Sequence, residues 1–469
     1  MPSAVVYMVE DDTERRLSSA VRGGKGGRDM KKLFKACSLI LCAAFGAAVG
    51  LSGCVGNGES TLLAAPAEAE SFSWPNSDSD EFRGIVDSAN SFAARFTQSV
   101  YGDYEEDNNL ALSPVSVYMS LALAAQCAEG DTREQILTAL GQSQGDLAAG
   151  FAYLYSSLNS SYLTGEVAVG NSIWLQEGVE FNADCIDSLA ADYYCYSYAA
   201  DFRGDNKDAN LAVRRFVREQ TKGLIDVDFQ LDDETCFALV SALYLKDNWN
   251  FYGDDIALTE DNYNFTQSDG EVISTKLMRG YYSVGRVQSG QGFTTFYADT
   301  YHGYSLHFIL PDEGYTVRDV MTADAINYVL DIPDYGYEDN INKIHYYTRC
   351  LFPQFSASYD GDVKGTLAEE FGITNLFDEL GCNLSSLLPD GKNDLGENVF
   401  CTQVRHLTTL TVDRKGIEGA AVVILPGAGA PGPDEYEEVY LDCVIDRSFG
   451  YVLTDRYGTV LFTGVVNNI

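Results

Sequence analysis

The sequence predicts a mixed α+β protein, with helices mainly in the first half of the folded region and strands mainly in the second. Early segments place apolar residues three and four positions apart, which is typical of amphipathic helices. Later segments contain short, continuous apolar runs, which are typical of strands buried on both faces. The chain has 469 residues, of which 46% are hydrophobic, and this is sufficient for one large core.

Four segments predict helices: 82–100, 112–130, 130–141 and 209–225. We expect Ser113 to cap the second helix, because Pro114 follows at the first helical position. We expect Asp131 to cap the third, with Glu134 three residues on and Gly141 at its end.

Three later segments predict strands. Residues 236–250 and 304–311 are nearly continuous apolar runs. Residues 449–466 predict two strands joined by a turn at 455–458, where Gly458 suits the turn. Since no second linker and no internal repeat follow, we expect residues 81–469 to form one domain.

Residues 1–53 predict an N-terminal extension and a lipoprotein-type signal peptide. Within 30–54, lysines precede an apolar run that is short for a membrane span, and the run ends in Leu-Ser-Gly-Cys. This ending resembles the lipobox of bacterial lipoproteins and implies lipidation of Cys54 and a membrane anchor. The alternative is an ordinary secretory signal with a chance cysteine. Residues 1–29 fit neither case, so either Met30 is the true start or the gene is over-extended.

The protein is therefore expected to be exported, as a bacterial cell-surface lipoprotein or an extracellular protein. Residues 54–80, rich in Gly, Ser, Ala, Glu and Asp, predict a flexible tether. The formal charge of −38 argues against a nucleic-acid partner, because phosphate binding needs a basic patch. The acidity serves either solubility or steering toward a cationic partner.

The sequence predicts no metal centre, no cofactor and no enzyme activity. The histidines are scattered and no Cys-x-x-Cys motif occurs. Nucleophile-elbow, zinc-protease and P-loop motifs are missing too, and Ser113 is better explained as a helix cap than as a nucleophile paired with His406. Eight cysteines follow the tether, which allows 105 disulfide pairings, and the sequence does not choose among them.

Six segments in one order carry a resemblance to the serpin family. They are NLALSPVSVYMSLALAAQCAEGDTREQIL (109–137), LVSALYLKDNW (239–249), FPQF (352–355), LAEEFGITNLF (367–377), HLTTLTVDRKGIEGAA (406–421) and DRSFGYVLTDRYGTVLFTGVVNN (446–468). The resemblance covers nearly all of residues 82–469. It implies a serpin fold of about eight or nine helices around three β-sheets, with an exposed reactive-centre loop at about 414–440, in a monomer.

The resemblance implies a serine protease inhibitor that acts as a suicide substrate. The protease forms an acyl-enzyme with the residue before the scissile bond, and the freed N-terminal part of the loop inserts into the central sheet as a new strand. Insertion drags the protease along and distorts its active site. The inserted segment must avoid buried charges, and the uninserted fold must be metastable. The hinge residues are Gly416, Ile417, Glu418, Gly419, Ala420 and Ala421.

Two positions near the hinge depart from the family pattern. Ile417 stands where inhibitory serpins favour a small residue, and Arg414 stands where an acid is usual. The bulk of Ile417 is expected to slow insertion, which would let deacylation win. The alternative is therefore a non-inhibitory serpin-fold protein, with a binding or structural role, whose loop is only cleaved.

The usual family spacing places the scissile bond at Ala430–Pro431. Because the interval after the hinge is long and Pro makes a poor substrate, Ala428–Gly429 and Gly429–Ala430 are rivals. Tyr436 is a further choice. Small residues here imply an elastase-like or subtilisin-like serine protease as partner, and a floppy loop without selectivity is the alternative.

The resemblance also implies a sheet-opening region. Its residues are Ser113, Ser116, Ser241, Trp249 and His406. Ser241 stands where an Asn is usual, which alters the hydrogen-bond network expected there. Asp247, close to Trp249, replaces a Gly. None of these residues is catalytic in the family, and plain core packing is the alternative role.

Overall fold

The computed structural model describes residues 60–67, 79–104, 107–162, 165–231, 233–250, 256–282, 286–331, 338–339, 344–418 and 437–469. All of them lie in the second of the two units into which the chain divides, residues 59–469. Nine α-helices and three β-sheets occur within the described residues, which confirms the predicted α+β class.

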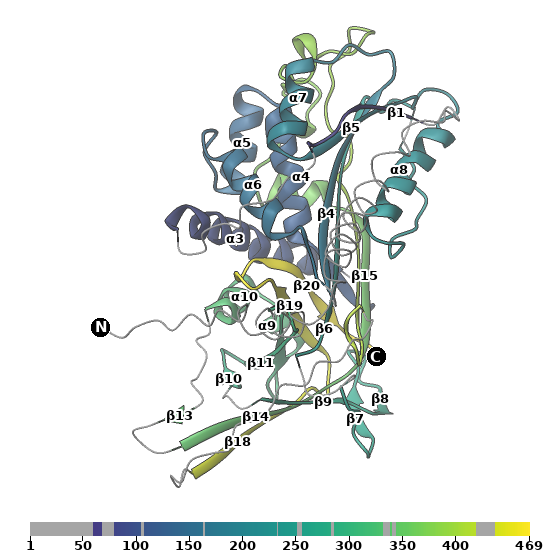
Figure 1. The fold of residues 1–469 in the computed structure, drawn as a ribbon. Helices are drawn as coiled ribbons and strands as arrows, with labels where there is room; N and C mark the ends of the chain where they lie inside the picture. Colours follow the sequence, from purple (N-terminus) through teal and green to yellow (C-terminus); the bar gives the residue numbers. More distant parts are fainter. Residues whose placement is uncertain are drawn as a thin grey trace, which may run out of the picture. The chain divides into compact units, whose positions relative to one another are not determined.

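The helices lie mainly in the first half of this unit, as predicted (Figure 1). They are α3 (Asp80–Asp103), α4 (Pro114–Cys127), α5 (Gly130–Leu140), α6 (Leu147–Ser157), α7 (Ala183–Asp192), α8 (Lys207–Gln220), α9 (Val317–Val320), α10 (Ala323–Leu330) and α11 (Lys364–Glu369). Two short 3-10 helices follow at Asn375–Phe377 and Pro389–Gly391.

One large sheet runs through the unit. Its strands, in spatial order, are β1 (Thr61–Ala64), β5 (Cys195–Ala200), β4 (Glu166–Gln176), β6 (Phe237–Asn248), β17 (Gly416–Ile417), β16 (Arg405–Val412), β15 (Phe355–Asp362), β2 (Leu110–Leu112), β20 (Val460–Val466), β19 (Phe449–Thr454), β12 (Ser305–Pro311), β11 (Phe293–Asp299) and β10 (Gln288–Ser289). Strand β3 (Ser160–Ser161) pairs with β4.

Two smaller sheets complete the strands of the described residues. One contains β9 (Met278–Tyr282), β13 (Glu338–Asp339), β14 (Ile344–Phe352) and β18 (Glu437–Val444), and the other contains β7 (Tyr263–Thr266) and β8 (Val272–Thr275). Strand β18 runs parallel to β14 and antiparallel β9 flanks the other edge of β14.

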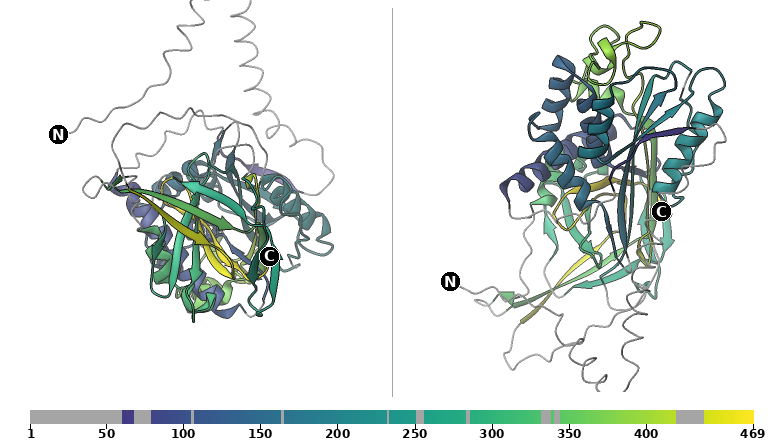
Figure 2. Two further views of the ribbon diagram at one scale, coloured as in Figure 1. Left: turned by 90° about the horizontal axis from the view of Figure 1, so that it is seen from below. Right: turned by 45° about the horizontal axis from the view of Figure 1, so that its top comes forward.

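Strands β4 and β6 are covered on both faces, with α4 on one side and α8 on the other (Figures 1 and 2). Along β4, Ile173 packs in the main core, whereas Trp174 packs edge-on against Phe216 of α8. Along β6, Leu239 contacts the main core and Val240 contacts the α8 cluster. Because successive side chains of a strand point to opposite faces, this double cover explains the continuous apolar run.

Two helix starts differ from the prediction. Ser113 occupies the N-cap of α4, but its side chain makes no capping hydrogen bond because its hydroxyl is paired with Ser116. Helix α5 begins at Gly130 with Glu129 at the N-cap, so Asp131 lies inside its first turn and is not the cap. The predicted stop is confirmed, since Gly141 adopts φ 63°, the left-handed conformation that favours glycine.

The predicted C-terminal hairpin is confirmed by β19 and β20. Their ladder runs from Phe449↔Val466 to Thr454↔Val460. Buried Asp455 shapes the turn, because its Oδ1 accepts hydrogen bonds from two backbone N–H groups, those of Tyr457 at 2.9 Å and Thr459 at 2.8 Å.

The segment 54–80, predicted to be a tether, contains a strand. Residues 61–64 form β1, which pairs antiparallel with β5 through Thr61↔Ala199 and Leu62↔Tyr198. Leu62 is 46% exposed, so the pairing adds backbone hydrogen bonds at a sheet edge and leaves this apolar side chain largely in solvent. Sequence periodicity has little to detect in such a strand. Among the described helices, none is long and apolar enough to cross a membrane.

Candidate functional site at the hinge of the central sheet

The hinge enters the large sheet as the two-residue strand β17. Gly416 pairs with Asn248, and Ile417 pairs with Asp247 on one side and with Val412 on the other. A tight turn leads into it: Asp413 Oδ1 accepts hydrogen bonds from the N–H groups of Lys415 at 2.8 Å and Gly416 at 3.2 Å. The chain therefore reverses direction after β16 and lies between β16 and β6.

Gly416 is required by close backbone contact. A Cβ atom at this position would lie 2.0 Å from the carbonyl oxygen of Asp247, which is backbone and cannot move aside. The family's hinge glycine thus has a steric reason in this chain. The next side chain, that of Ile417, is fully buried in the main core, so the fold accommodates its bulk at this position.

Within the described residues, the ladder between β6 and β16 consists of β17 alone. The other neighbour of β6 is β4, which pairs with residues 237–246, and the other neighbour of β16 is β15, which pairs with residues 405–412. Both strands are long, whereas β17 covers one end of the boundary between them. A longer strand at this boundary would find a partner on each side.

Glu418 marks the point where the chain leaves the ladder. It has φ 48°, which is unusual for a residue other than glycine. Its N–H donates to Thr411 O at 3.0 Å, and Tyr244 Oη donates to its Oε1 at 3.1 Å. Burial raises the pKa of this half-buried carboxyl. The hinge therefore places an acid partly inside the sheet at its last described position.

At His406, six residues before Val412 on β16, a buried polar network attaches α4 to the sheet. The N–H of Ser113 donates to His406 Nε2 at 3.0 Å, and the hydroxyls of Ser113 and Ser116 lie 3.0 Å apart. Because Nε2 accepts this bond, the imidazole is neutral, and its burial lowers the pKa of His406 to about 4. The structure thus brings together three of the five residues predicted for the sheet-opening region.

Ser241 lies apart from this network, next to a residue that the sequence analysis did not single out. Its register partner on β4 is Asn171, which is fully buried. The hydroxyl of Ser241 and both amide atoms of Asn171 are buried and have no hydrogen-bond partner within the described structure. Such atoms are uncommon in native proteins, because each unpaired polar group costs free energy.

Trp249, in contrast, has its polar groups paired at the hinge end. Its indole Nε1 donates to Asp413 O at 2.7 Å and its N–H donates to Lys415 O at 3.1 Å. Its ring packs edge-on against Phe352. Trp249 therefore holds the turn between β16 and β17.

The Asp247 carboxylate, which stands where the family usually has a Gly, is fully buried and paired with His302. His302 Nδ1 lies 2.6 Å from Oδ1, and the His302 N–H donates to Oδ2 at 2.8 Å. The imidazole stacks on Tyr162 at 4.0 Å between ring centroids. A Cβ at Gly165 would lie 2.7 Å from the same carboxylate, so this glycine makes room for the pair.

Several predicted site residues lie outside the described residues. They are the hinge residues Gly419, Ala420 and Ala421, the scissile region Ala428, Gly429, Ala430 and Pro431, and Cys54.

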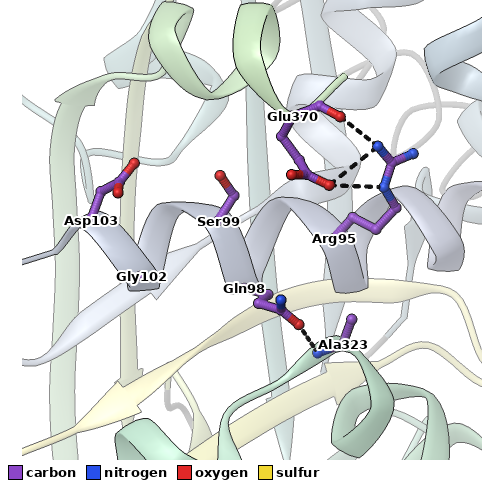
Figure 3. A pocket seen from close by; sticks show the side chains of 7 residues that line it. All are labelled: Arg95, Gln98, Ser99, Gly102, Asp103, Ala323 and Glu370. Atoms are coloured by element: carbon purple, nitrogen blue, oxygen red, sulfur yellow. Dashed lines mark hydrogen bonds and ion pairs between the residues drawn. The ribbon is translucent and has the colours of Figure 1, made fainter. Parts of the chain in front are cut away.

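A pocket beside α3 offers no better site. It has a volume of about 220 Å³ and is open and polar (Figure 3). Its polar groups already bond to one another: Arg95 donates to the Glu370 carbonyl at 2.6 Å, and the Ala323 N–H donates to Gln98 Oε1 at 2.7 Å. Among the described residues, no group of three or more His, Cys, Asp or Glu side chains could hold a metal ion.

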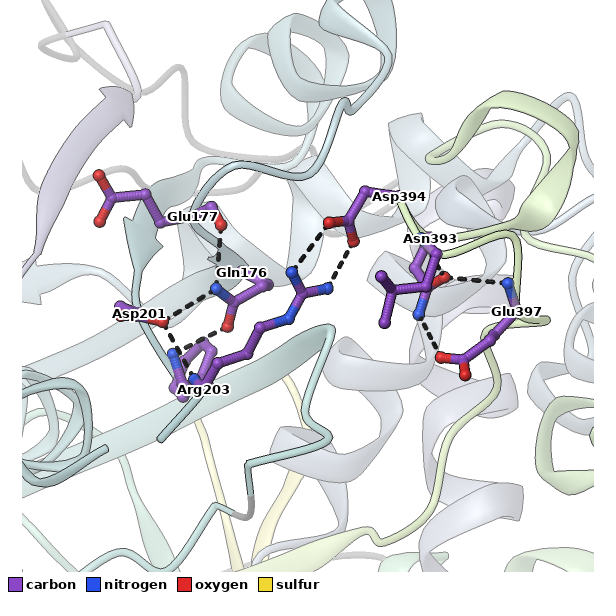
Figure 4. A network of polar contacts seen from close by, with 9 residues as sticks. Gln176, Glu177, Asp201, Arg203, Asn393, Asp394 and Glu397 are labelled. Carbon is purple, nitrogen blue, oxygen red and sulfur yellow. Dashed lines mark hydrogen bonds and ion pairs between the residues drawn. The ribbon is translucent and has the colours of Figure 1, made fainter. Parts of the chain in front are cut away.

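A satisfied polar network marks the end of β4 far from the hinge (Figure 4). Gln176 Nε2 donates to Asp201 Oδ1 at 3.1 Å, and the Arg203 guanidinium binds both oxygens of Asp394 at 2.5 and 2.9 Å. This network joins the end of the sheet to the loop around Asn393 and has a structural role.

Comparisons with known proteins agree with this architecture. The family model described as "Serpin (serine protease inhibitor)" matches residues 87–469. Alpha-1-antiproteinase of Callosciurus caniceps is 24% identical over 379 residues, covering 77% of this chain and 83% of its own length. Alpha-1-antiproteinase S of Cavia porcellus is 23% identical over 386 residues, covering 80% and 88%.

Solved structures share the fold. The thermophilic serpin tengpin in its native state has a TM-score of 0.68 at 21% identity, covering 88% of this chain and all of its own. Thyroxine-binding globulin in complex with thyroxine has a TM-score of 0.65 at 22% identity, covering 82% and 99%. Given the family match over most of the chain, and a hinge strand seated between β6 and β16, this protein belongs to the serpin family.

Proposed function

We propose that this protein inhibits a serine protease by covalent trapping. The protease cleaves the segment that follows the hinge, and the freed strand extends β17 along β6 and β16. The family is one of serine protease inhibitors, and the curated relatives named above are antiproteinases. The target class and the mechanism are our inference for this chain.

The observation that carries the proposal is the position of β17. Its two residues already pair with both flanking strands, and Ile417 is already buried. Extension therefore continues an existing ladder and needs no new nucleus. The Ser241 hydroxyl on β6 and the amide of its register partner Asn171 on β4 are buried without partners in the described structure, and a shift of β6 on insertion could give them partners.

The proposed targets are elastase-like or subtilisin-like proteases. The support is the small side chains of residues 428–430, and the sequence contains no Arg or Lys between Lys415 and Arg447, which argues against trypsin-like enzymes. We further propose that the chain is exported and anchored to the cell surface by a lipid on Cys54, on the evidence of its signal-like N-terminus.

The test is to incubate the full chain with pancreatic elastase and with subtilisin, then to separate the products on denaturing gels. A band at the summed mass of protein and protease establishes trapping, and mass spectrometry of the released C-terminal peptide identifies the scissile bond. Ala421→Arg is the hinge variant, because insertion would bury its charge, and Ala149→Arg makes the same substitution at an exposed position of α6. We expect the first to abolish the band and the second to retain it.

The second candidate is a non-inhibitory serpin whose loop is only a substrate. The observation that favours it is the hinge sequence, in which Ile417 replaces the small residue of inhibitory serpins, although the described fold already buries this side chain. Clean cleavage with active protease and no high-mass band would support this candidate. No cleavage by either enzyme would overturn the proposed target class.

A further inference from the structure

The thiols of Cys127 and Cys185 meet where the end of α4 packs against the first turn of α7. Cys127 is the last residue of α4 and is fully buried, and Cys185 is 5% exposed. Cys185 Sγ lies 3.9 Å from the carbonyl oxygen of Gln126, the residue next to Cys127. The two thiols are also close enough to shift each other's pKa, upward for Cys127 and downward for Cys185.

This contact is held in place by the Gln126 side chain. Its Nε2 donates to Ser188 Oγ at 3.2 Å, and its Oε1 accepts from Tyr193 Oη at 3.3 Å. Both partners follow Cys185 in the sequence, Ser188 on α7 and Tyr193 just after it. The Gln126 side chain therefore holds the end of α4 against α7 beside Cys127 and Cys185.

A third cysteine lies close by but is oriented differently. Cys195 begins β5, and its thiol donates to the carbonyl oxygen of Tyr196 at 3.6 Å, on its own strand. Its other fixed neighbour is the register partner Asn171 on β4. Cys195 is thus an alternative disulfide partner for Cys185, and the experiment must distinguish it from Cys127.

Two other cysteines, Cys350 and Cys443, face each other in register on the parallel strands β14 and β18. A strand spacing of about 4.8 Å lies within the Cα range of disulfides, so this pair is a second candidate that the test must distinguish from the first.

We propose that Cys127 and Cys185 form a disulfide that joins α4 to α7. The oxidant is a disulfide of the thiol-exchange class, such as glutathione disulfide. Cys185 thiolate attacks it and releases one thiol; Cys127 thiolate then attacks the Cys185 sulfur and releases the second. Two protein thiols thus lose two electrons and two protons, and the oxidant becomes two thiols. The interaction with the Cys127 thiol lowers the pKa of Cys185, which favours Cys185 as the attacking group.

The bridge would enclose residues 128–184, and a loop of this length stabilises a fold mainly by restricting the unfolded chain. An exported chain meets the oxidising conditions that the bridge needs. The assignment does not depend on protease inhibition, so the failure of one proposal leaves the other intact.

The test is to refold the full chain from urea in a buffer of glutathione and glutathione disulfide, then to block free thiols with N-ethylmaleimide. Digestion without reductant uses trypsin and chymotrypsin together, because Tyr193 and Tyr194 provide cleavage sites between Cys185 and Cys195. We expect a cross-linked peptide pair that contains Cys127 and Cys185, and a pair that contains Cys350 and Cys443 would be a separate bridge. Alkylation of both Cys127 and Cys185, or a bridge from Cys185 to Cys195, would overturn the proposal.

Two variants provide a thermal readout. We expect Cys127→Ala, which adds no polar group to the core, to lower the Tm of the oxidised protein by about 5 °C more than that of the reduced protein. Cys236→Ala, which changes a cysteine outside the cluster, should show the same change in Tm in both states. An equal loss for Cys127→Ala in the oxidised and reduced protein would indicate lost packing instead of a lost bridge, and would count against the proposal.

Discussion

The two ends of the boundary between β6 and β16 differ in which buried polar groups lack a partner. At the hinge end, the Trp249 indole and the carboxylates of Asp413 and Asp247 have partners, and single oxygens of Asn248 and Glu418 do not. Six residues along β6 from Asp247, the Ser241 hydroxyl and both amide atoms of Asn171, its register partner on β4, are buried without partners in the described structure, whereas His406 on β16 is bonded to Ser113. The first region holds the start of a strand, and the second leaves whole polar side chains unpaired on the β6 side of the place where the strand would continue.

The largest effect is expected from breaking the buried pair at the hinge end. His302→Ala leaves the Asp247 carboxylate without its imidazole, and we expect the free energy of unfolding to fall by about 4 kcal/mol in urea titrations followed by tryptophan fluorescence. The double variant Asp247→Gly with His302→Ala removes the charge as well and restores the residue usual in the family. It should recover most of the loss, and an equal loss in both variants would contradict the pairing.

The next effect is a loss of stability in acid through His406. Its folded pKa of about 4 lies below its ordinary value of 6.5, so the unfolded chain binds a proton that the folded chain excludes. Stability from this group is complete above about pH 6.5 and falls as the pH drops toward 4, by about 3 kcal/mol. Buried His307 has a similarly lowered pKa and acts in the same direction.

Asp455 opposes this trend, because burial raises its pKa to about 6 and it favours the fold as the pH drops through that value. The contribution of His406 is therefore measured by comparing the pH dependence of stability in a His406 variant with that in the unmodified protein. His406→Gln, whose amide oxygen can accept the Ser113 N–H, should flatten the fall between pH 6.5 and 4 relative to the unmodified chain. An unchanged profile would show that His406 does not supply it.

A smaller effect is expected from the contact at Gly416. In Gly416→Ala, the new Cβ meets the Asp247 carbonyl oxygen, and we expect a loss of about 2 kcal/mol. Hydrogen exchange should show faster exchange at the Ile417 and Glu418 amides. Gly365→Ala is a matched control, since a Cβ there meets no atom within 4 Å. Equal protection in both variants would argue against a steric requirement at Gly416.

The smallest effect is expected where polar groups lack partners. Ser241→Asn places an amide opposite Asn171 and should raise the free energy of unfolding by about 1 kcal/mol, because both amides can then pair. If the protein is an inhibitor, the same change should slow insertion and increase the fraction of cleaved, untrapped product on gels. No gain in stability would indicate that Asn171 is already satisfied.

The sequence predicted the elements whose signals are local. The double-sided apolar run of β6 and the turn before β20 are examples, and the order of motifs was sufficient for the family. Ser113 occupies the predicted N-cap position of α4, but the expected side-chain capping bond is not formed because its hydroxyl pairs with Ser116. Its N–H bonds to His406, 293 positions away, and no local rule anticipates that contact.

The same holds for the pairs that define the hinge. Asp247 was noted as a departure from the family, but its partner His302 is 55 positions away. No pattern in the sequence singles out Asn171. Its role depends on its register with Ser241, which places three unpaired polar atoms together. Local patterns determine which residues are buried, whereas the partner of a buried polar group depends on tertiary packing.

The double cover of β4 and β6 has a mechanical consequence. Widening the boundary with β16 by one strand spacing, about 4.8 Å, requires β6 to translate. Because β6 is laddered to β4 along ten residue pairs, β4 to β5 and β5 to β1, and α8 is packed on β4 and β6, these parts are expected to move together as one rigid body. Opening of the sheet is then resisted at the surface where this body slides over α4. Substitutions that smooth or enlarge the side chains at that surface should therefore change the rate of opening without any change in the loop.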